Sequence, residues 1–351
     1  MDGSFFLTQW LYQAMSWVYQ KLVVLFGASA NASGHGGWVV VLTIFVFTLA
    51  IRAATSVGDI SSRKSSIKMA AIQPELDKLQ KKYQNDPQKL NMEQQKIMKA
   101  NGVSMFGGCL PMLLMFPLLI MFFNAFRAWA NEQMLALMLA IENGEGLTMF
   151  QGFKFLWITN IWRPDNLTAG GSLMNGSEFW STFAVTNNIE RFFYFQKNQA
   201  ALQDILYKLH FYTVKINSLG QIEGYEFAKD AGAAFRVAYE GFVKPITDSI
   251  PKFYSMSNGF AILPVLAGAT GFLQMWIMQK TQPQQANTQA NSSMKMMNYM
   301  MPLISVFFCY RYDATFAFYW IFSNIIALGI NLILNSVFQK DKRKTATEVK
   351  A

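Results

Sequence analysis

The chain is poor in the residue types that most catalytic and metal sites use. It has two histidines and two cysteines in 351 residues, and only 15% of its residues are charged. Neither the H-E-x-x-H pattern of zinc proteases nor the G-x-S-x-G pattern of serine hydrolases occurs. Cys109 and Cys309 both lie in apolar stretches, which predicts neither a disulfide framework nor a zinc site. We therefore expect no metal, no cofactor and no enzymatic activity.

Apolar residues are abundant instead. Hydrophobic residues make up 52% of the chain and aromatic residues 15%, with 31 Phe and 21 Met. This composition is typical of a membrane protein and not of a soluble domain. The N-terminal stretch MDGSFFLTQWLYQ has no basic region and no small-residue cleavage site. We therefore expect that no signal peptide is removed.

Long apolar runs predict five membrane spans, and hence an all-α integral membrane protein. The spans are 38–57, 109–130, 260–279, 296–311 and 314–338. Nine Lys and Arg lie between Arg63 and Lys99 and five lie in the tail, so the positive-inside rule places 58–106 and 339–351 in the cytoplasm. An odd number of spans then places the N-terminus and 131–259 outside. We expect this topology in a plasma membrane.

Two segments outside the spans have helical patterns. Residues 1–37 predict an amphipathic helix lying in the membrane interface, followed by a loop, with a true span as the alternative. Residues 58–106 predict a cytoplasmic helical hairpin that turns at Asn85-Asp86-Pro87. A narrow apolar stripe follows its first helix: Met69, Ile72, Leu76, Leu79 and Tyr83. By itself this is a generic hairpin. Residues 280–295 predict a short polar cytoplasmic loop.

Arg52 lies near the inner end of an otherwise apolar run that begins at Trp38. At 1.5 Å rise per residue it is about 21 Å along the helix from Trp38, within a hydrocarbon layer about 30 Å thick. A guanidinium there costs about 2.5–3.5 kcal/mol on insertion scales, and it stays protonated. Two interpretations remain open. Either the side chain snorkels to the headgroups, or it faces a polar, water-filled site between spans.

The segment 163–258, within the outer region 131–259, has balanced charge and no long apolar run. Helical spacing over 178–212 and 226–247 predicts a helical extracellular insertion with little core of its own. We expect its aromatic residues to rest on the membrane interface or on the spans: Phe192, Phe193, Tyr194, Phe195, Phe211 and Tyr212.

Six segments, in order, carry a family resemblance. They are GGWVVVLTIFVFTLAIR, IQPELDKLQKKYQNDPQKLNMEQQKIMKANGVSMFGGCLPMLLMFP, FLWITN, ILPVLAGATGFLQ, KMMNYMMPLISVFF and FYWIFSN. The chain thereby resembles the YidC/Oxa/Alb family of membrane protein insertases, and we expect its Gram-positive type, which lacks the large domain that precedes the first core span in Gram-negative members. Three departures stand out. Met115 replaces a usual Gln, 312–315 replace a Pro-Ser-Gly-like turn, and 163–258 replace a short connection.

The resemblance implies a five-span core in which Arg52 lines a hydrophilic groove, open to cytoplasm and lipid, that holds client segments. By the same resemblance Thr48 and Trp320 match client-contacting positions, and Tyr319 belongs to the same groove. Three further polar residues lie inside spans and are candidates for its lining: Gln274, Asn324 and Asn331. The alternative for each is a hydrogen bond between helices, worth about 0.6 kcal/mol on average.

The resemblance also implies partners. These are nascent membrane proteins, the ribosome, the lipid bilayer, and the Sec translocon with the signal recognition particle receptor. Four tail residues are candidates for ribosomal RNA contacts: Lys340, Lys342, Arg343 and Lys344. Anionic lipid is their alternative partner. The rival function is a transporter or channel with a polar intramembrane site. It predicts acidic or histidine relay groups within spans, and the sequence has none.

Overall fold

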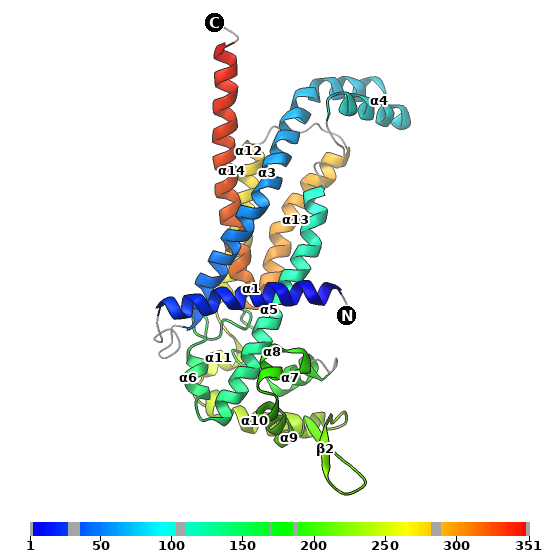
Figure 1. The fold of residues 1–351 in the computed structure, drawn as a ribbon. Coiled ribbons are helices and arrows are strands. Elements are labelled where there is room, and N and C mark those ends of the chain that lie inside the picture. Colours follow the sequence, from blue (N-terminus) through cyan, green and yellow to red (C-terminus); the bar gives the residue numbers. More distant parts are fainter. Residues whose placement is uncertain are drawn as a thin grey trace. The chain divides into compact units, whose positions relative to one another are not determined.

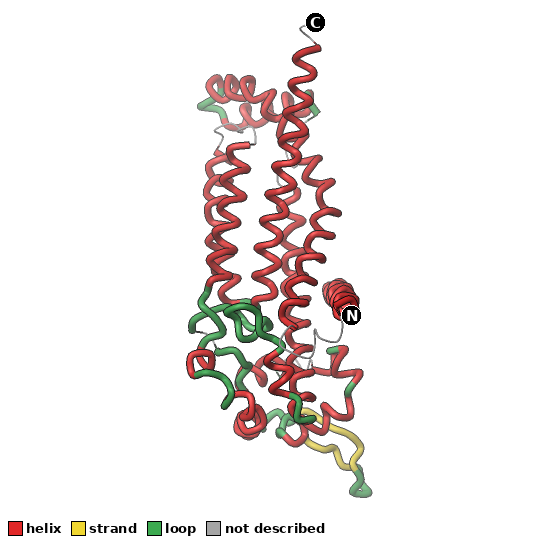
Figure 2. The backbone as a smooth tube through the Cα atoms, turned by 90° about the vertical axis from the view of Figure 1, so that its left-hand side faces the viewer, coloured by secondary structure: helices red, strands yellow, loops and turns green. Residues whose placement is uncertain are grey.

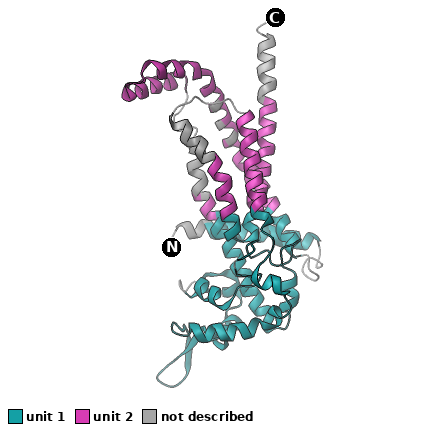
Figure 3. Cartoon of the chain, turned by 180° about the vertical axis from the view of Figure 1, so that it is seen from behind, with its two compact units in different colours: residues 1–44, 122–264, 308–317 teal, residues 45–121, 265–307, 318–351 magenta. Residues whose placement is uncertain are grey.

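The computed structural model describes residues 3–26, 36–102, 110–168, 170–184, 189–281 and 289–348. Helices dominate it (Figures 1 and 2), which confirms the all-α prediction. The chain forms two compact units (Figure 3). One unit comprises Met1–Ile44, Phe122–Pro264 and Phe308–Ala317, and we call it the outer unit because it contains the segment 131–259 that the sequence predicts to lie outside. The helical unit comprises Phe45–Met121, Val265–Phe307 and Phe318–Ala351.

Long helices build the helical unit and extend beyond it. They are α3 (Gly36–Lys82), α5 (Leu110–Glu142), α12 (Ile262–Thr281), α13 (Gln289–Arg311) and α14 (Ala314–Glu348). Among the described residues, three stretches are long and apolar enough to cross a membrane: Gly36–Lys82, Ile262–Thr281 and Ala314–Val337. Of the other two predicted spans, 296–311 falls within α13, and 109–130 falls within α5 except for residue 109, which lies outside the described residues. The count of five spans stays a prediction.

The hairpin of α3 and α4 (Pro87–Ala100) turns at the predicted Asn85-Asp86-Pro87. Asp86 caps α4 by accepting a hydrogen bond from the backbone N–H of Lys89 at 3.0 Å. The predicted stripe forms a small core, in which Ile72 and Leu76 are buried. Around them pack Met69, Ile97 and Met98. Met69 and Met98 are therefore packing residues of the hairpin.

Helix α1 (Gly3–Phe26) forms in the segment where the sequence predicts a helix. It packs one face into the outer unit through Leu11 and Met15, and it crosses the axis of α5 (Figure 1). Trp10 and Trp17 are more than half exposed on the other side. An exposed aromatic face of this kind suits the membrane interface.

The rest of the outer unit contains short elements, many of them inside the insertion. They are α6 (Gly146–Gln151), α7 (Gly176–Phe183), η1 (Ile189–Arg191), α8 (Phe193–Lys197), α9 (Gln199–Lys208), β1 (Tyr212–Ile216), β2 (Ile222–Phe227), α10 (Gly232–Thr247) and α11 (Lys252–Met256).

Contrary to expectation, the insertion has an aromatic core of its own. Five rings at 0% exposure pack together, with centroids 4.5–5.9 Å apart in the closest pairs: Phe179, Phe183, Phe211, Phe235 and Tyr239. Phe195 and Tyr212 are also buried, whereas Phe193 is exposed. The prediction that these aromatics rest on the membrane interface or on the spans was therefore wrong for Phe211 and Tyr212, whose ring partners lie within the insertion. They find partners across helices that are distant in sequence.

The helical pattern over 178–212 corresponds to several short helices, the last of which ends at Lys208. Residues 212–227 form an antiparallel hairpin instead. Aromatic and β-branched residues favour a strand in the stretch from Tyr212 to Ile216. Asn217 closes the turn, since its side chain accepts from the backbone N–H groups of Leu219 and Gln221. Gly220 adopts φ +76°, which only glycine reaches without strain.

Candidate functional site

The Arg52 side chain reaches from α3 to α14 inside the helical unit. Its Nε donates a hydrogen bond to Oγ of Ser323 at 2.9 Å, and its Nη2 donates to the same oxygen. Ser323 is only 5% exposed and also bonds to Tyr319. The guanidinium therefore points between two helices toward neutral hydroxyl groups.

No described carboxylate forms an ion pair with Arg52. Among the described residues, none of the ion pairs within 4.0 Å includes it. A hydroxyl group orients a guanidinium but leaves its charge in place. Sequence reasoning missed Ser323, although it is a lone serine beside Asn324 in the apolar segment FYWIFSN.

The other predicted groove residues differ in their surroundings. Thr48 and Tyr319 are buried at 1% and 7% exposure, while Trp320 is partly exposed. Asn324 joins α14 to α12, because its Nδ2 lies 3.3 Å from the carbonyl oxygen of Ala267 and 3.2 Å from Oγ1 of Thr270. That bond between helices was the alternative weighed for this residue.

Two predicted residues bond within their own helices. Asn331 donates to the carbonyl oxygen of Ala327 at 2.9 Å. Gln274 has a weak contact of 3.9 Å from Nε2 to the sulfur of Met278. No hydrogen bond among the described residues joins either one to Arg52, so their place in a groove stays a proposal.

A second arginine, which sequence reasoning assigned only to the basic hairpin, also bridges helices. Arg63 is 5% exposed, and its Nη2 donates to the carbonyl oxygen of Thr281 at 2.8 Å and to Oδ1 of Asn335 at 2.6 Å. Among the described residues its Nε and Nη1 have no hydrogen-bond partner. Eleven residues make about three helical turns, so Arg63 shares a face of α3 with Arg52. This spacing in the sequence could have indicated that Arg63 and Arg52 lie on the same face of the helix.

The predicted ribosome-binding residues lie on a helix. The backbone of α14 stays helical to Glu348, but the side chains of Lys340, Lys342, Arg343 and Lys344 lie outside the described part. Within the described residues, no group of three or more His, Cys, Asp or Glu is placed to hold a metal ion.

Comparison with known proteins assigns the family. The model of the 60Kd inner membrane protein family matches residues 32–342. A membrane protein insertase YidC of Clostridium perfringens is 38% identical over 140 residues, which are 40% of this chain and 51% of that relative. One from Chlorobium limicola is 26% identical over 300 residues, or 86% of this chain and 34% of the relative. The chain thus spans about half, or less, of the length of these relatives. It is a bacterial membrane protein that belongs to the 60Kd inner membrane protein (YidC/Oxa1) family.

Proposed function

We propose that the protein is a membrane protein insertase that receives client segments in a hydrophilic groove carrying the charge of Arg52. The observation that carries this proposal is the pairing of a guanidinium with a neutral hydroxyl, Ser323, between two apolar helices. An unneutralised cation is costly in such a place, so its presence argues for a functional role. The family to which the chain belongs includes proteins named YidC insertases, which supports the same function. This family is not a known class of enzymes.

The mechanism follows from electrostatics. A polar or acidic segment costs several kcal/mol in hydrocarbon without compensating bonds. A solvated cation partway into the membrane attracts carboxylates and shortens the apolar distance that the segment crosses. The apolar part of the client then moves into lipid without further cost. We place the groove on the cytoplasmic side, the N-terminus outside and the C-terminus inside.

The proposed clients are nascent membrane proteins, delivered from the ribosome. The Sec translocon and the signal recognition particle receptor are further proposed partners. The basic end of α14 is the proposed ribosome contact, since phosphate binding requires clustered Lys and Arg. No cofactor has a role in this mechanism.

Reconstitution tests the proposal. Liposomes that contain only this protein are supplied with a small single-span client during its synthesis, and protease protection reports insertion. We expect insertion that empty liposomes do not support. Ion flux through the same liposomes tests the rival transporter or channel. A selective flux together with failure of insertion would replace the insertase proposal.

A further inference from the structure

Three short segments of the outer unit pack into one layer where α12 begins. They are 155–160, 164–172 and 253–262. Backbone bonds join them: Thr159 N–H to the carbonyl of Asn258 at 3.2 Å, Asn258 N–H to the carbonyl of Asn166 at 3.3 Å, and Ser172 N–H to the carbonyl of Tyr254 at 3.0 Å. We call this arrangement the loop layer.

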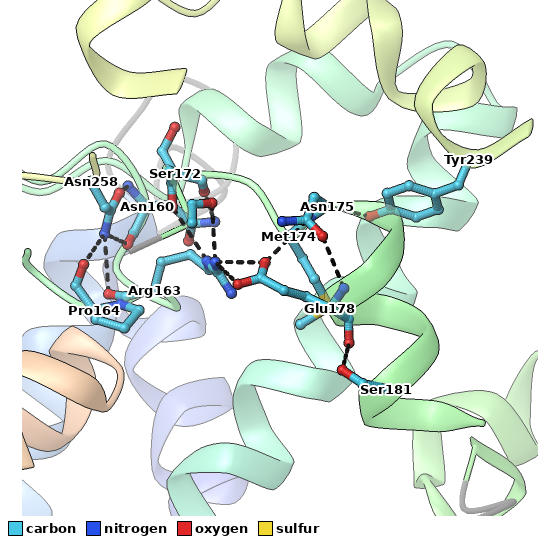
Figure 4. A network of polar contacts seen from close by, with 12 residues as sticks. Asn160, Arg163, Pro164, Ser172, Met174, Asn175, Glu178, Ser181, Tyr239 and Asn258 are labelled. Carbon is cyan, nitrogen blue, oxygen red and sulfur yellow. Dashed lines mark hydrogen bonds and ion pairs between the residues drawn. The ribbon is translucent and has the colours of Figure 1, made fainter. Parts of the chain in front are cut away.

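The interior of the loop layer is polar. Six polar residues are buried at 0–5% exposure: Asn160, Asp165, Asn166, Ser172, Ser257 and Asn258. Each of them has hydrogen bonds within the unit, and Figure 4 shows part of this network. The carboxylate of Asp165 accepts three hydrogen bonds, from Trp157 Nε1 at 3.1 Å and from the backbone N–H groups of Ala261 at 3.0 Å and Leu263 at 2.8 Å.

Most of the described exposed side chains of the same layer are apolar, and the two polar ones are Thr168 and Ser255. Six exposed apolar side chains form what we call the apolar rim: Leu156 at 64%, Leu167 at 48%, Phe253 at 46%, Met256 at 70%, Phe260 at 49% and Ile262 at 37% exposure. Phe253 and Phe260 stack with ring centroids 5.5 Å apart. Leu156 has φ +52°, a left-handed conformation that leucine rarely adopts. Backbone strain of this kind persists only where the surrounding structure fixes it.

The loop layer buries polar side chains and exposes mostly apolar ones, which is the opposite of what a solvent-exposed loop usually does. Irregular backbone survives next to hydrocarbon only when its N–H and C=O groups are satisfied within the protein. The buried Asn and Asp side chains supply those bonds here, and the rim then faces outward without exposing polar backbone. In water the rim would be an exposed apolar patch of the kind that marks an interaction site.

The direct connection of the rim to α12 indicates what covers the rim. Phe260 lies two residues before the start of this candidate span, of whose apolar window only 22% is buried within the protein. Two exposed lysines, Lys154 and Lys252, flank the rim in sequence, and lysine stems of this kind reach from apolar surface to headgroups. We propose that the apolar rim is immersed in the bilayer, at the boundary between headgroups and acyl chains, so that part of the apparent outer domain is a lipid-binding surface.

The β-hairpin gives a contrast within the same unit. Its turn also exposes apolar residues, namely Ile216, Leu219 and Ile222. Uncharged polar residues and a glycine separate them, and the ion pair of Lys215 and Glu223 flanks the turn. The hairpin points away from α11 at the far end of this unit (Figure 1). We therefore expect the hairpin tip to lie in water.

Labelling of single introduced cysteines in nanodiscs tests the proposal. Leu156→Cys and Met256→Cys probe the rim, and Leu219→Cys, at a position 80% exposed, is the matched control in water. Each variant reacts with a charged, membrane-impermeant maleimide, and labelling of the unmodified chain is subtracted. We expect both rim positions to react at least tenfold more slowly than the control, and all three to react equally after unfolding in detergent and urea.

One copy of the protein per nanodisc excludes a second copy as the cover of the rim. Labelling of Leu156→Cys and Met256→Cys at the rate of Leu219→Cys would overturn the proposal, because it would place the rim in water. A nitroxide attached at position 256 gives an independent measurement. Collisions with dissolved oxygen should exceed those with a water-soluble nickel chelate, and the reverse order would also overturn it.

Discussion

The Nη2 atom of Arg63 on α3 lies 2.6 Å from Oδ1 of Asn335 on α14. The same nitrogen donates to the carbonyl oxygen of Thr281 near the end of α12. One buried guanidinium therefore connects three helices of the helical unit, yet all its partners are neutral. This pairing makes Asn335 a structural acceptor for a charge that no described carboxylate balances.

Replacing that acceptor should destabilise the fold. Asn335→Ala leaves the buried cation with one acceptor fewer, so we expect a loss of about 1–3 kcal/mol in the free energy of unfolding. Arg63→Met removes an incompletely paired charge and keeps apolar volume, so its cost should be smaller. Unfolding followed by circular dichroism measures both. In the Arg63→Met background Asn335→Ala should cost little, and an unchanged cost there would contradict the pairing.

Arg52 should matter most for acidic clients. Arg52→Ala is expected to lower insertion of clients with acidic outer segments more than that of clients with neutral ones, because the lost interaction is electrostatic. Arg52→Lys should retain much of the activity, since a point charge suffices where no bidentate geometry is needed. Insertion into proteoliposomes at matched protein levels is the measurement. Equal losses for the two client types would make Arg52 a structural residue.

Ser323→Ala separates orientation of the guanidinium from its charge. It removes the hydroxyl that accepts from Arg52 but keeps the positive charge. We expect it to affect acidic clients less than Arg52→Ala does in the same assay. An equal defect would assign the main role to the hydroxyl.

The insertion should be removable without loss of insertase activity. Deleting 165–257, which is nearly the whole insertion 163–258, would remove Asp165. The carboxylate of Asp165 accepts hydrogen bonds from backbone N–H groups at the start of α12. Replacing 176–247 with a Gly-Ser linker keeps that contact and removes α7 to α10. We expect stable expression and insertion of simple clients. A stably expressed variant without activity would assign a lid or docking role to the insertion.

Stability should depend on pH through Glu132, a buried residue on α5 beyond the predicted span. Burial raises its pKa from 4.5 to about 7, although its carboxylate accepts the backbone N–H groups of Phe193 and Tyr194. The folded state thus binds this proton more tightly than the unfolded state. The resulting stability is fully present below pH 4.5 and is lost as pH rises through 7, by about 3 kcal/mol.

The measurement for Glu132 is a comparison of variants. Glu132→Gln should lose this component of the pH dependence of unfolding. Glu142→Gln, on the same helix but at an exposed position, should keep the wild-type profile. A profile of Glu132→Gln that coincides with that of the wild type would refute the assignment.

Ribosome association should depend on the end of α14. Truncation after 339 removes Lys340, Lys342, Arg343 and Lys344. We expect weaker co-sedimentation with ribosomes, and a steep loss with added salt for the full chain, because phosphate contacts release counterions. Unchanged co-sedimentation of the truncated chain at low salt would exclude the tail as the contact.

Several features follow from the sequence alone. The helical pattern with its long apolar runs predicts the membrane helices, and Asp86-Pro87 predicts the hairpin turn with its stripe of Ile72 and Leu76. These signals are local, since a helix period, a cap or an apolar run can be read within one segment. Arg52 is conspicuous for the same reason, because its charge contradicts the apolar sequence around it.

Only the tertiary structure decided what lies opposite each of these residues. Ser323 is 271 positions from Arg52 and Asn335 is 272 from Arg63, so no pattern within a segment indicates these pairs. The aromatic residues of the insertion look like interface residues in sequence, yet Phe211 is buried against Phe179 and Phe235. Tertiary packing also decides that the loop layer buries its Asn and Asp side chains and exposes the apolar rim. A side chain's environment is set by neighbours distant in the chain, and sequence periodicity does not contain them.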